Sequence, residues 1–496
     1  MSETTGPGPD ETRPAKPTRD ALDVLRRPQA IRARCAAITR AVEKGLSSHF
    51  RLDRSKLDDA AALVAQVMQE TYPDGHIPMH SQWRRFDAGG VPRIAELDRL
   101  LAGRSVAEQT RSRIDLTLIS VLLGASAGAH WRYTEGRAQD ALALPVQVQR
   151  TDELFKLLDR VMAKPEAQAS AAAADEPGAT AAPAAPAGQV VQVVQAAQAA
   201  DGAAFGRSEG LAVASFRAFT AGVFSSQTGD LLRADAATLR LIDTAALRGV
   251  FQVGAGNVLV GLEGRAGVMS ALGESLQAAA RRDGFEARPG RLYDRLLAHS
   301  QAQGDGSSVS AELLLNELLR LLAPAWRDGT RVLGLPAGDV WQHRWAGEDD
   351  GNGRRDLTTP GWVPVHQISQ WLAYSLVEPL QSAGLRVTGL EALTALPGYR
   401  SGGLLIDTGV ITLRNPRDAS RVWKLGDELI VEWRALTLTL LDELAERLRQ
   451  RLGLDATALP LSSVLEGGTW AAGRRIAQQL HDGAPPLRID SDGTVL

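Results

Sequence analysis

The sequence predicts a mainly α-helical protein with a small β-hairpin. Apolar residues recur at every third or fourth position over long stretches, which is the spacing of one helix face. Only one short region is rich in β-branched residues and bounded by Gly, Pro and Asn. We find no series of strands alternating with helices, which a doubly wound nucleotide-binding fold requires. The expected fold is therefore one large helical domain.

Composition divides the 496 residues into four segments. Residues 1–20 are polar and Pro-rich and offer little to bury, so they predict a disordered tail. Residues 21–162 form the N-terminal helical part of the domain. Residues 163–204 are rich in Ala and Pro, and because recurring prolines break helices we interpret them as a flexible insertion. Residues 205–496 form the C-terminal helical part of the same domain.

Three apolar stripes locate individual helices. The first consists of Leu57, Ala60, Ala61, Val64, Val67 and Met68. The second ends at the helix breaker Pro324 and consists of Leu313, Leu314, Leu318, Leu321 and Leu322. The third ends at Gly453, a residue type common after helix C-termini, and consists of Leu436, Leu440, Leu441, Leu444 and Leu448. The hairpin is expected between Gly403 and Arg434.

Charge and cysteine content exclude several classes of protein. With 55 basic and 58 acidic residues, the net charge of -3 provides no electrostatic footprint for nucleic acid or an anionic membrane. Cys35 is the single cysteine, which excludes a disulfide framework and a cysteine-based zinc site. No apolar stretch is long enough to span a bilayer, and the polar N-terminus lacks the layout of a signal peptide. We expect a cytoplasmic protein that binds neither nucleic acid nor membrane.

Two spacings resemble known sites but favour other interpretations. Gly254, Gly256 and Gly261 are spaced as GxGxxxxG rather than GxGxxG, which favours a tight turn into a helix over a nucleotide loop. His76 and His80 are four residues apart, as zinc ligands on a helix would be, but Pro78 between them forbids that helix. We expect loop histidines with ordinary hydrogen bonds there, no metal site and no cofactor.

The feature that indicates function is a set of tryptophans beside polar residues. Ten tryptophans occur in a chain with only 5% aromatic residues, and Trp341 and Trp371 are two of those with polar neighbours. Aromatic walls that carry a few polar groups are typical of small-molecule pockets. Each tryptophan alone is more simply explained as a core residue, but together they favour a pocket.

One predicted helix, over residues 366–375, supports a sharper hypothesis. His366, Gln370 and Tyr374 recur at every fourth position and share one face, while Ile368 and Leu372 face the core. A face of imidazole, amide and phenol groups can present hydrogen-bonding groups to a ligand, whereas a solvated face more often carries Lys and Glu. Ligand contact and a structural role are both open on this pattern.

Segments along nearly the whole chain outside the tail and the insertion resemble one protein family. They include IPMHSQWRRFDAGG (77–90), RSEGLAVASFRAF (207–219), NVLVGLEGRAG (257–267), GDVWQH (338–343), VPVHQISQWLAYSLVEPL (363–380), LTALPGYRSGGLLIDTGV (393–410), ELIVEWRALT (428–437), VLEGGTWAAGR (464–474) and DGTVL (492–496). In this order they identify the chain as a member of the Urc/Urg uracil-catabolism proteins. A fainter resemblance is to the queuosine 5′-phosphate N-glycosidases of queuosine salvage, whose all-helical fold is similar to that of helical DNA glycosylases.

The two resemblances together imply hydrolysis of the N-ribosidic bond of a ribosylurea-type phosphate, with release of urea. The partners implied are this small phosphorylated riboside and other uracil-catabolism enzymes. Such a reaction needs carboxylates beside an oxocarbenium-like sugar and basic groups around a phosphate. In family-like segments the candidate catalytic residues are Asp339, Asp407 and Glu432. The candidate substrate-binding residues are His366, Gln370, Tyr374, Trp341, Trp371, Tyr399, Arg400 and Arg434.

Structural roles compete with these assignments. Glu432 and Arg434 can form buried ion pairs with each other or with Glu263 and Arg265, and Asp407 can cap a turn.

Three positions depart from the family pattern. Gly124 and Gly398 stand where the pattern has an acid, and Gln367 stands where it has a lysine. Glycine provides neither charge nor a hydrogen-bonding side chain. The alternative to a hydrolase is therefore a catalytically weak or inactive paralogue that serves as a ligand-binding or partner protein in the same pathway.

Overall fold

The computed structural model describes residues 22–128, 130–136, 203–303, 306–326, 330–490 and 493–495. Helices dominate these residues, as the sequence predicts. The helices are α2 (Pro28–Glu43), α3 (Leu57–Thr71), α4 (Gln82–Arg85), α5 (Arg93–Leu100), α6 (Val106–Leu123), α10 (Arg207–Thr220), α11 (Ala236–Leu239), α12 (Thr244–Val250), α13 (Leu262–Asp283), α14 (Arg291–Ala298), α15 (Ala311–Leu322), α16 (Gln367–Gln381), α17 (Tyr399–Asp407), α18 (Glu428–Leu452), α19 (Leu461–Val464) and α20 (Trp470–His481).

The strands are short and form small separate sheets. They are β1 (Phe50–Leu52), β2 (Arg132–Thr134), β3 (Ala204–Gly206), β4 (Gln301–Gln303), β5 (Gly306–Ser310), β6 (Thr330–Val332), β7 (Leu335–Gly338), β8 (Val340–Gln342), β9 (Trp362–Pro364), β10 (Leu385–Thr388), β11 (Ile411–Leu413), β12 (Val422–Lys424) and β13 (Arg488–Asp490). Antiparallel pairs are β1–β11, β2–β3, β4–β5, β6–β7 and β8–β9, whereas β10–β5 and β12–β13 are parallel.

The three apolar stripes are confirmed as helices. They lie on α3, α15 and α18, and each stripe is largely buried. The predicted ends are also confirmed, because α15 stops at Leu322 before Pro324, and Gly453 follows α18 in the left-handed conformation. Gly254 to Asn257 form a tight bridge ahead of α13, as expected for a turn into a helix.

The hairpin predicted between Gly403 and Arg434 is wrong in its position. Residues 403–407 belong to α17, residues 428–434 begin α18, and β11 between them pairs with the distant β1. Packing overrides the β-branched composition here, because α17 and the first turns of α18 are buried on several sides as helices. Antiparallel hairpins form instead at β4–β5 and β6–β7.

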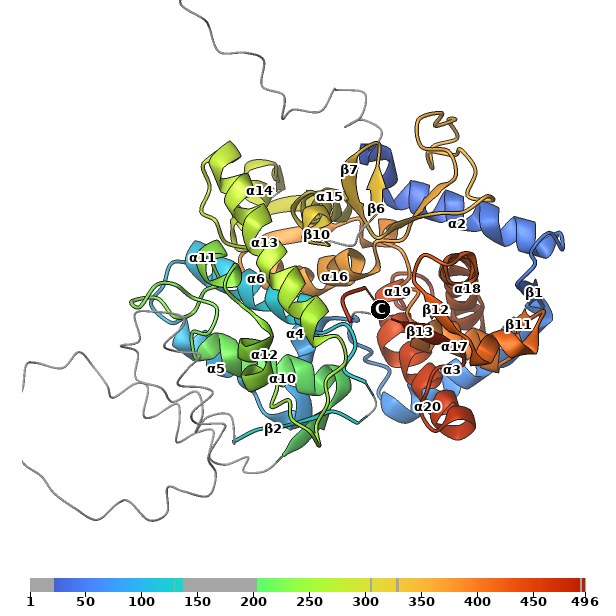
Figure 1. The fold of residues 1–496 in the computed structure, drawn as a ribbon, viewed down its shortest axis with the longest axis horizontal. Helices are drawn as coiled ribbons and strands as arrows, with labels where there is room; N and C mark the ends of the chain where they lie inside the picture. The colour runs from blue at the N-terminus through green and yellow to red at the C-terminus, as the bar shows by residue number, and fades with distance from the viewer. Residues whose placement is uncertain are drawn as a thin grey trace, which may run out of the picture.

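The helices gather in two groups on either side of α16 (Figure 1). One group contains α5, α6 and α10 to α14. The other contains α2, α3 and α17 to α20, so the first helices of the described chain lie beside its last helices (Figure 1). One continuous hydrophobic cluster joins both groups and α16, which makes them parts of a single core.

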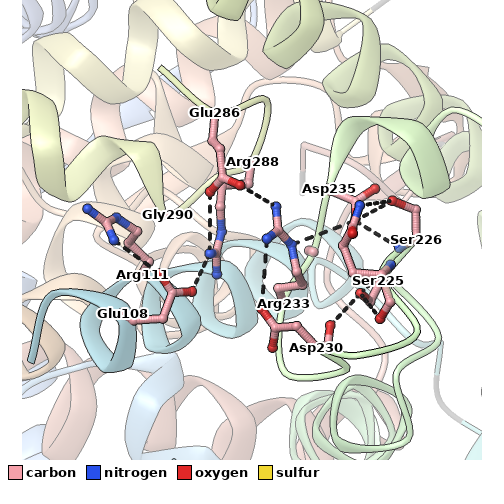
Figure 2. A network of polar contacts seen from close by, with 12 residues as sticks. Glu108, Arg111, Ser225, Ser226, Asp230, Arg233, Asp235, Glu286, Arg288 and Gly290 are labelled. Carbon is pink, nitrogen blue, oxygen red and sulfur yellow. Dashed lines mark hydrogen bonds and ion pairs between the residues drawn. The ribbon is translucent and has the colours of Figure 1, made fainter. Parts of the chain in front are cut away.

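A buried polar network helps to hold the first group together. The guanidinium of Arg288 on the loop before α14 is fully buried and pairs with Asp115 of α6. It also pairs with Glu108 of the same helix (Figure 2). Asp115 also accepts from the backbone N–H groups of Ala234 and Gly290. Each buried charge in this network is thus matched by a partner of opposite charge or by N–H donors.

No helix among the described residues is long and apolar enough to cross a membrane. The predicted tail (1–20) lies outside the described residues, and so does the predicted insertion (163–204) except for its last two residues, of which Ala204 begins β3.

Candidate functional site

A pocket lies where both helix groups meet α16, and we call it the central pocket. It is bordered by the segment 124–128 after α6 and by the first residues of α10, α16 and α17. The lining residues used below are His80, Arg85, Arg207, Gln367, Trp371, Gly398, Tyr399, Arg400 and Trp470.

Three helix N-termini converge on the central pocket. The N-cap positions of α10, α16 and α17 are Gly206, His366 and Gly398, and none of them caps its helix with a side-chain hydrogen bond. The first N–H groups of an α-helix have no partner within the helix, and the helix dipole gives them a partial positive charge. This convergence favours an anionic ligand.

Arg85 at the end of α4 adds a buried cation to the same place. Its guanidinium stacks on Trp371 at 5.0 Å and on Trp470 at 5.1 Å from the ring centroids. Its side chain is only 9% exposed, its Nη2 donates no hydrogen bond, and the nearest carboxylate oxygen, of Glu466, is 3.9 Å away. A buried donor of this kind usually has a partner, and here a ligand can provide one.

Arg207 and Arg400 bring two further cations to the pocket. The guanidinium of Arg207 makes no hydrogen bond or ion pair with any residue that the structure describes, and its backbone has a φ of 54°. Burial lowers the pKa of Arg207, and the charge of Arg400 lowers it further. Arg400 stacks on Tyr399 and, within the part of the chain that the structure describes, donates only to the carbonyl of Gly483, at 3.1 Å. The three guanidinium groups together create a strongly positive pocket.

Two more lining residues have buried polar atoms without a partner among the described residues. These atoms are Nε1 of Trp371, which is a donor, and Oε1 of Gln367, which is an acceptor. With Nη2 of Arg85 on α4, the pocket therefore contains three buried polar atoms, on α4 and α16, that have no partner among the residues the structure describes. They can bind both a phosphate and a neutral amide-like group.

His80 lines the same pocket and pairs with Glu466. Its Nδ1 lies 2.5 Å from Oε2 of Glu466, which belongs to a π-helical turn, Leu465–Thr469, between α19 and α20. The interpretation of His80 as a loop histidine with ordinary hydrogen bonds is confirmed, since residues 72–81 contain no helix. Among the described residues, no group of three His, Cys, Asp or Glu side chains is arranged to hold a metal ion.

Three of the residues predicted from the sequence, Trp371, Tyr399 and Arg400, line the central pocket. Asp339 lies directly behind it, because its Oδ2 accepts from the backbone N–H of Gln367 at 3.0 Å. Both carboxylate oxygens of Asp339 bind Arg434 at 2.7 Å, and Oδ1 also accepts from Nε1 of Trp341. These three residues fix the start of α16.

The other two candidate carboxylates lie outside the pocket lining. Glu432 is buried on α18, where it accepts from Ser47 and lies 3.5 Å from His343. Asp407 ends α17 and lies 2.8 Å from Nε2 of His481, and burial raises the pKa of its carboxyl group. Each of them has a protein partner.

The polar face of the 366–375 helix binds protein groups. Gln370 forms two hydrogen bonds with Thr394, and the hydroxyl of Tyr374 donates to the carbonyl of Thr394 at 3.2 Å. His366 precedes α16 in the left-handed conformation, and its Nε2 lies 3.1 Å from the carbonyl of Leu25. Gln370 and Tyr374 thus hold the segment that leads to Gly398.

All three departures from the family pattern lie in this pocket: Gly124, Gln367 and Gly398. A Cβ on Gly398 would lie 3.2 Å from Nε2 of Gln367, so positions 367 and 398 are immediate neighbours. The carbonyls of Leu123 and Ser126, on either side of Gly124, accept hydrogen bonds from Arg265. Arg265 therefore holds the 124–128 segment that borders the pocket.

No pattern in the sequence predicted His80, Arg85 and Arg207 as pocket residues. Each lies inside a quoted family-like segment, 77–90 or 207–219, and Arg85 follows a tryptophan-containing motif. Their position inside these segments was the only indication in the sequence that they could be functional. No local pattern indicates that these segments meet α16 and α17.

Comparison with known proteins identifies the family. The family described as "Protein of unknown function (DUF1688)" matches residues 24–151 and 185–496. The chain belongs to this family. Protein urg3 of Schizosaccharomyces pombe is 31% identical over 477 residues, which cover 94% of this chain and 97% of the relative. Uracil catabolism protein 4 of Lachancea kluyveri is 30% identical over 475 residues, which cover 91% of this chain and 93% of the relative. The Urc/Urg family assignment made from the sequence is confirmed.

Proposed function

We propose that this protein acts in uracil catabolism and hydrolyses the N-ribosidic bond of a ribosylurea-type phosphate, releasing urea. The pathway is supported by the name of the Lachancea kluyveri relative. The reaction is suggested by the fainter resemblance to helical N-glycosidases, with which the mainly helical fold is compatible. The central pocket is the proposed active site, and other uracil-catabolism enzymes are the proposed partners.

The observation that carries the proposal is the set of unpartnered groups in one positive pocket. Arg85, Arg207 and Arg400, with the uncapped starts of α10 and α17, provide charge-assisted donors for a phosphate. Nε1 of Trp371 and Oε1 of Gln367 provide one donor and one acceptor, which match the carbonyl and the N–H groups of urea.

The charge of the pocket makes the phosphate a requirement of the reaction. Cleavage of the C1′–N bond gives the sugar a positive charge in the transition state, and three nearby guanidinium groups would oppose it. A dianionic phosphate bound among them offsets that repulsion. We therefore expect ribosylurea without a phosphate to be a much poorer substrate.

In this proposal Asp339 supports the reaction through Gln367 and not by contact with the sugar. Its ion pair with Arg434 fixes the carboxylate, and the carboxylate fixes the N–H of Gln367 at the start of α16. Arg434 holds the pKa of Asp339 below its usual value even though burial acts in the opposite direction. Asp339 therefore stays ionised and keeps its positioning role over the physiological pH range.

A ligand-binding protein without catalysis is the second candidate function. The observation that favours it is the absence of a carboxylate side chain at Gly124 and Gly398, both of which line the pocket. A pocket that retains its phosphate-binding groups but lacks acids there can bind the same ligand without cleaving it.

The test is urea release by the purified full chain from synthetic 5-phosphoribosylurea, with unphosphorylated ribosylurea and UMP as control substrates. We expect urea from the phosphorylated compound alone. Tight binding by calorimetry without urea release would favour the ligand-binding protein. If the chain neither binds the compound nor releases urea from it, both functions are contradicted.

A further inference from the structure

We propose that His80 is the general base of the central pocket and that Glu466 positions and polarises it. This inference rests on the hydrolase function proposed above, and it names a catalytic residue for that reaction.

The geometry of the pair defines the tautomer of His80. Glu466 can only accept when ionised, so the hydrogen bond between them places a proton on Nδ1 of His80. Nε2 then carries the free lone pair, and the structure gives it no hydrogen-bond partner among the described residues. A ring held in this way in a pocket wall can accept a proton from a water molecule.

Both residues of the pair are held in place by backbone contacts. The N–H of His80 donates to the carbonyl of Ser462 at 3.0 Å, and the ring lies 6.1 Å from the ring of Trp371. Glu466 lies in the π-helical turn 465–469, and a π-turn inside a helix commonly occurs at a functional site. These contacts fix the imidazole relative to the ligand-binding groups of α16.

The surrounding charges keep the pair in its working protonation states. Burial lowers the pKa of His80, and Arg85 adds to this effect while Glu466 opposes it, so the ring is neutral near pH 7. Burial alone would raise the pKa of Glu466, but His80, Arg85 and Arg474 outweigh it and bring the pKa to about 2. Tyr72 is a further titratable neighbour of Glu466, and its pKa is raised by burial and by Glu466, so it is uncharged near pH 7.

The proposed step conserves atoms and charge. Nε2 of His80 accepts a proton from water while the water oxygen forms a bond to C1′. The C1′–N bond breaks, and its electron pair goes to the urea nitrogen. That nitrogen then takes up one proton, which the imidazolium of His80 returns directly or through water. The products are ribose 5-phosphate and urea.

This assignment bears on the two missing acids of the pocket. Gly124 and Gly398 line the pocket without a carboxylate, while His80, which Glu466 supports from outside the lining, retains a base in the same pocket. The chain thus has a group that can activate water without either acid.

The experiment compares His80→Asn, Glu466→Gln and, as a matched control, His76→Asn. His76 lies in the same loop, and its side chain is 89% exposed, so it is outside the pocket. Binding of ribose 5-phosphate, measured by calorimetry, shows whether each variant is folded with an intact pocket. Urea release from 5-phosphoribosylurea is then measured as a function of pH.

We expect His80→Asn to bind ribose 5-phosphate but to lose about 100-fold or more in kcat. The wild-type kcat should fall on the acidic side only below the ordinary histidine pKa of about 6.5. Because Glu466 raises the pKa of His80, Glu466→Gln should move that acidic limb to still lower pH and reduce kcat. A purely structural role of Glu466 would not shift the limb. His76→Asn should behave as wild type.

The outcomes separate this inference from the proposed function. An active wild type with a His80→Asn variant within threefold of its kcat would overturn the role of His80 and leave the hydrolase intact. If His80→Asn fails to fold, an acidic limb that does not move in Glu466→Gln overturns it instead. If the wild type binds ribose 5-phosphate but releases no urea, the hydrolase function is contradicted. The role of His80 as its general base is then contradicted as well.

Discussion

Two clusters of arginines in this protein have opposite electrostatic character. In the network around Arg288, the guanidinium contacts Asp115. It also contacts Glu108 and Glu286 (Figure 2). In the central pocket, the nearest carboxylate to Arg85 is 3.9 Å away, and Arg207 and Arg400 pair with no carboxylate among the described residues. In the first cluster the central guanidinium pairs with carboxylates of the protein, whereas in the second the guanidinium groups lack close carboxylate partners.

The difference distinguishes a structural arginine from a ligand-binding one. Removing a charge from water costs several kcal/mol, so a buried cation needs an anionic partner in the working state of the protein. Arg288 has that partner within the chain, and its network joins α6 to the loops before α11 and α14. For Arg85 the missing charge is best supplied by a bound anion.

The largest expected effect is on stability in the matched cluster. Asp115→Asn leaves the buried guanidinium of Arg288 with the partly exposed Glu108 as its main acid, so the free energy of unfolding should fall by about 3–5 kcal/mol. Urea denaturation measures the loss. The control Glu286→Gln, whose carboxylate is 57% exposed, should cost less than about 1 kcal/mol. An equal loss in both variants would show that burial of the acid is not what matters.

The pH dependence of stability should report on Glu466, the acid nearest to Arg85. Its pKa is about 2 in the folded state against an ordinary glutamate value of 4.5, so ionised Glu466 stabilises the fold above pH 4.5. This contribution, about 3 kcal/mol at most, is lost as the pH falls through 4.5 towards 2. The difference in unfolding free energy between wild type and Glu466→Gln, measured from pH 6 to pH 3, should therefore shrink. A constant difference would mean that Glu466 is not ionised in the pocket.

Removing the unmatched cation should affect binding and leave stability nearly unchanged. Arg85→Met keeps an apolar chain between Trp371 and Trp470 and should weaken ribose 5-phosphate binding about 10- to 100-fold, as expected for loss of a charged hydrogen bond. Stability should stay the same or rise, because a buried charge with a weak partner is removed. Arg84→Met, at an exposed position paired with Glu378, is the control. If calorimetry shows that Arg85→Met binds ribose 5-phosphate with unchanged affinity, the proposal that the phosphate binds in this pocket is contradicted.

The smallest effect is expected from returning an acid to the pocket. Gly398→Glu places a carboxylate near Gln367 and Arg400, and its Cβ meets only the flexible end of Gln367 at 3.2 Å. We expect ribose 5-phosphate affinity to fall about three- to tenfold, since the added charge partly neutralises the pocket. Gly398→Gln is the uncharged control. An increase in urea release by Gly398→Glu alone would identify the natural chain as the catalytically weakened form.

Gly124 is a less suitable position for the same test. Its Cβ would lie 2.7 Å from the backbone carbonyl of Ser120, which cannot move as a side-chain end can. Gly124→Asp should therefore reduce the free energy of unfolding as well as change the pocket, and the comparison with Gly398→Glu separates the two effects.

The sequence by itself determined the helical class and several helix limits. Leu57 to Met68, Leu313 to Leu322 and Leu436 to Leu448 formed helices because their 3.6-residue periodicity is a local property. It also determined the family, and it indicated Trp371, Tyr399 and Arg400 as residues of a pocket. It did not distinguish a strand from a buried helix at 428–434, where burial on several sides permits β-branched residues in a helix.

Only the tertiary structure decided which polar groups already have partners. Asp339 and Glu432 are both acids in buried, family-like segments, but the fold gives the first Arg434 and the second Ser47. His80 and Arg85 look like ordinary loop and helix residues in the sequence. They become parts of a site because the ends of α10, α16 and α17, distant along the chain, meet beside them. Whether a buried charge has a partner depends on how close it lies to segments that are far away in the sequence. Those segments come together only when the chain packs into one core.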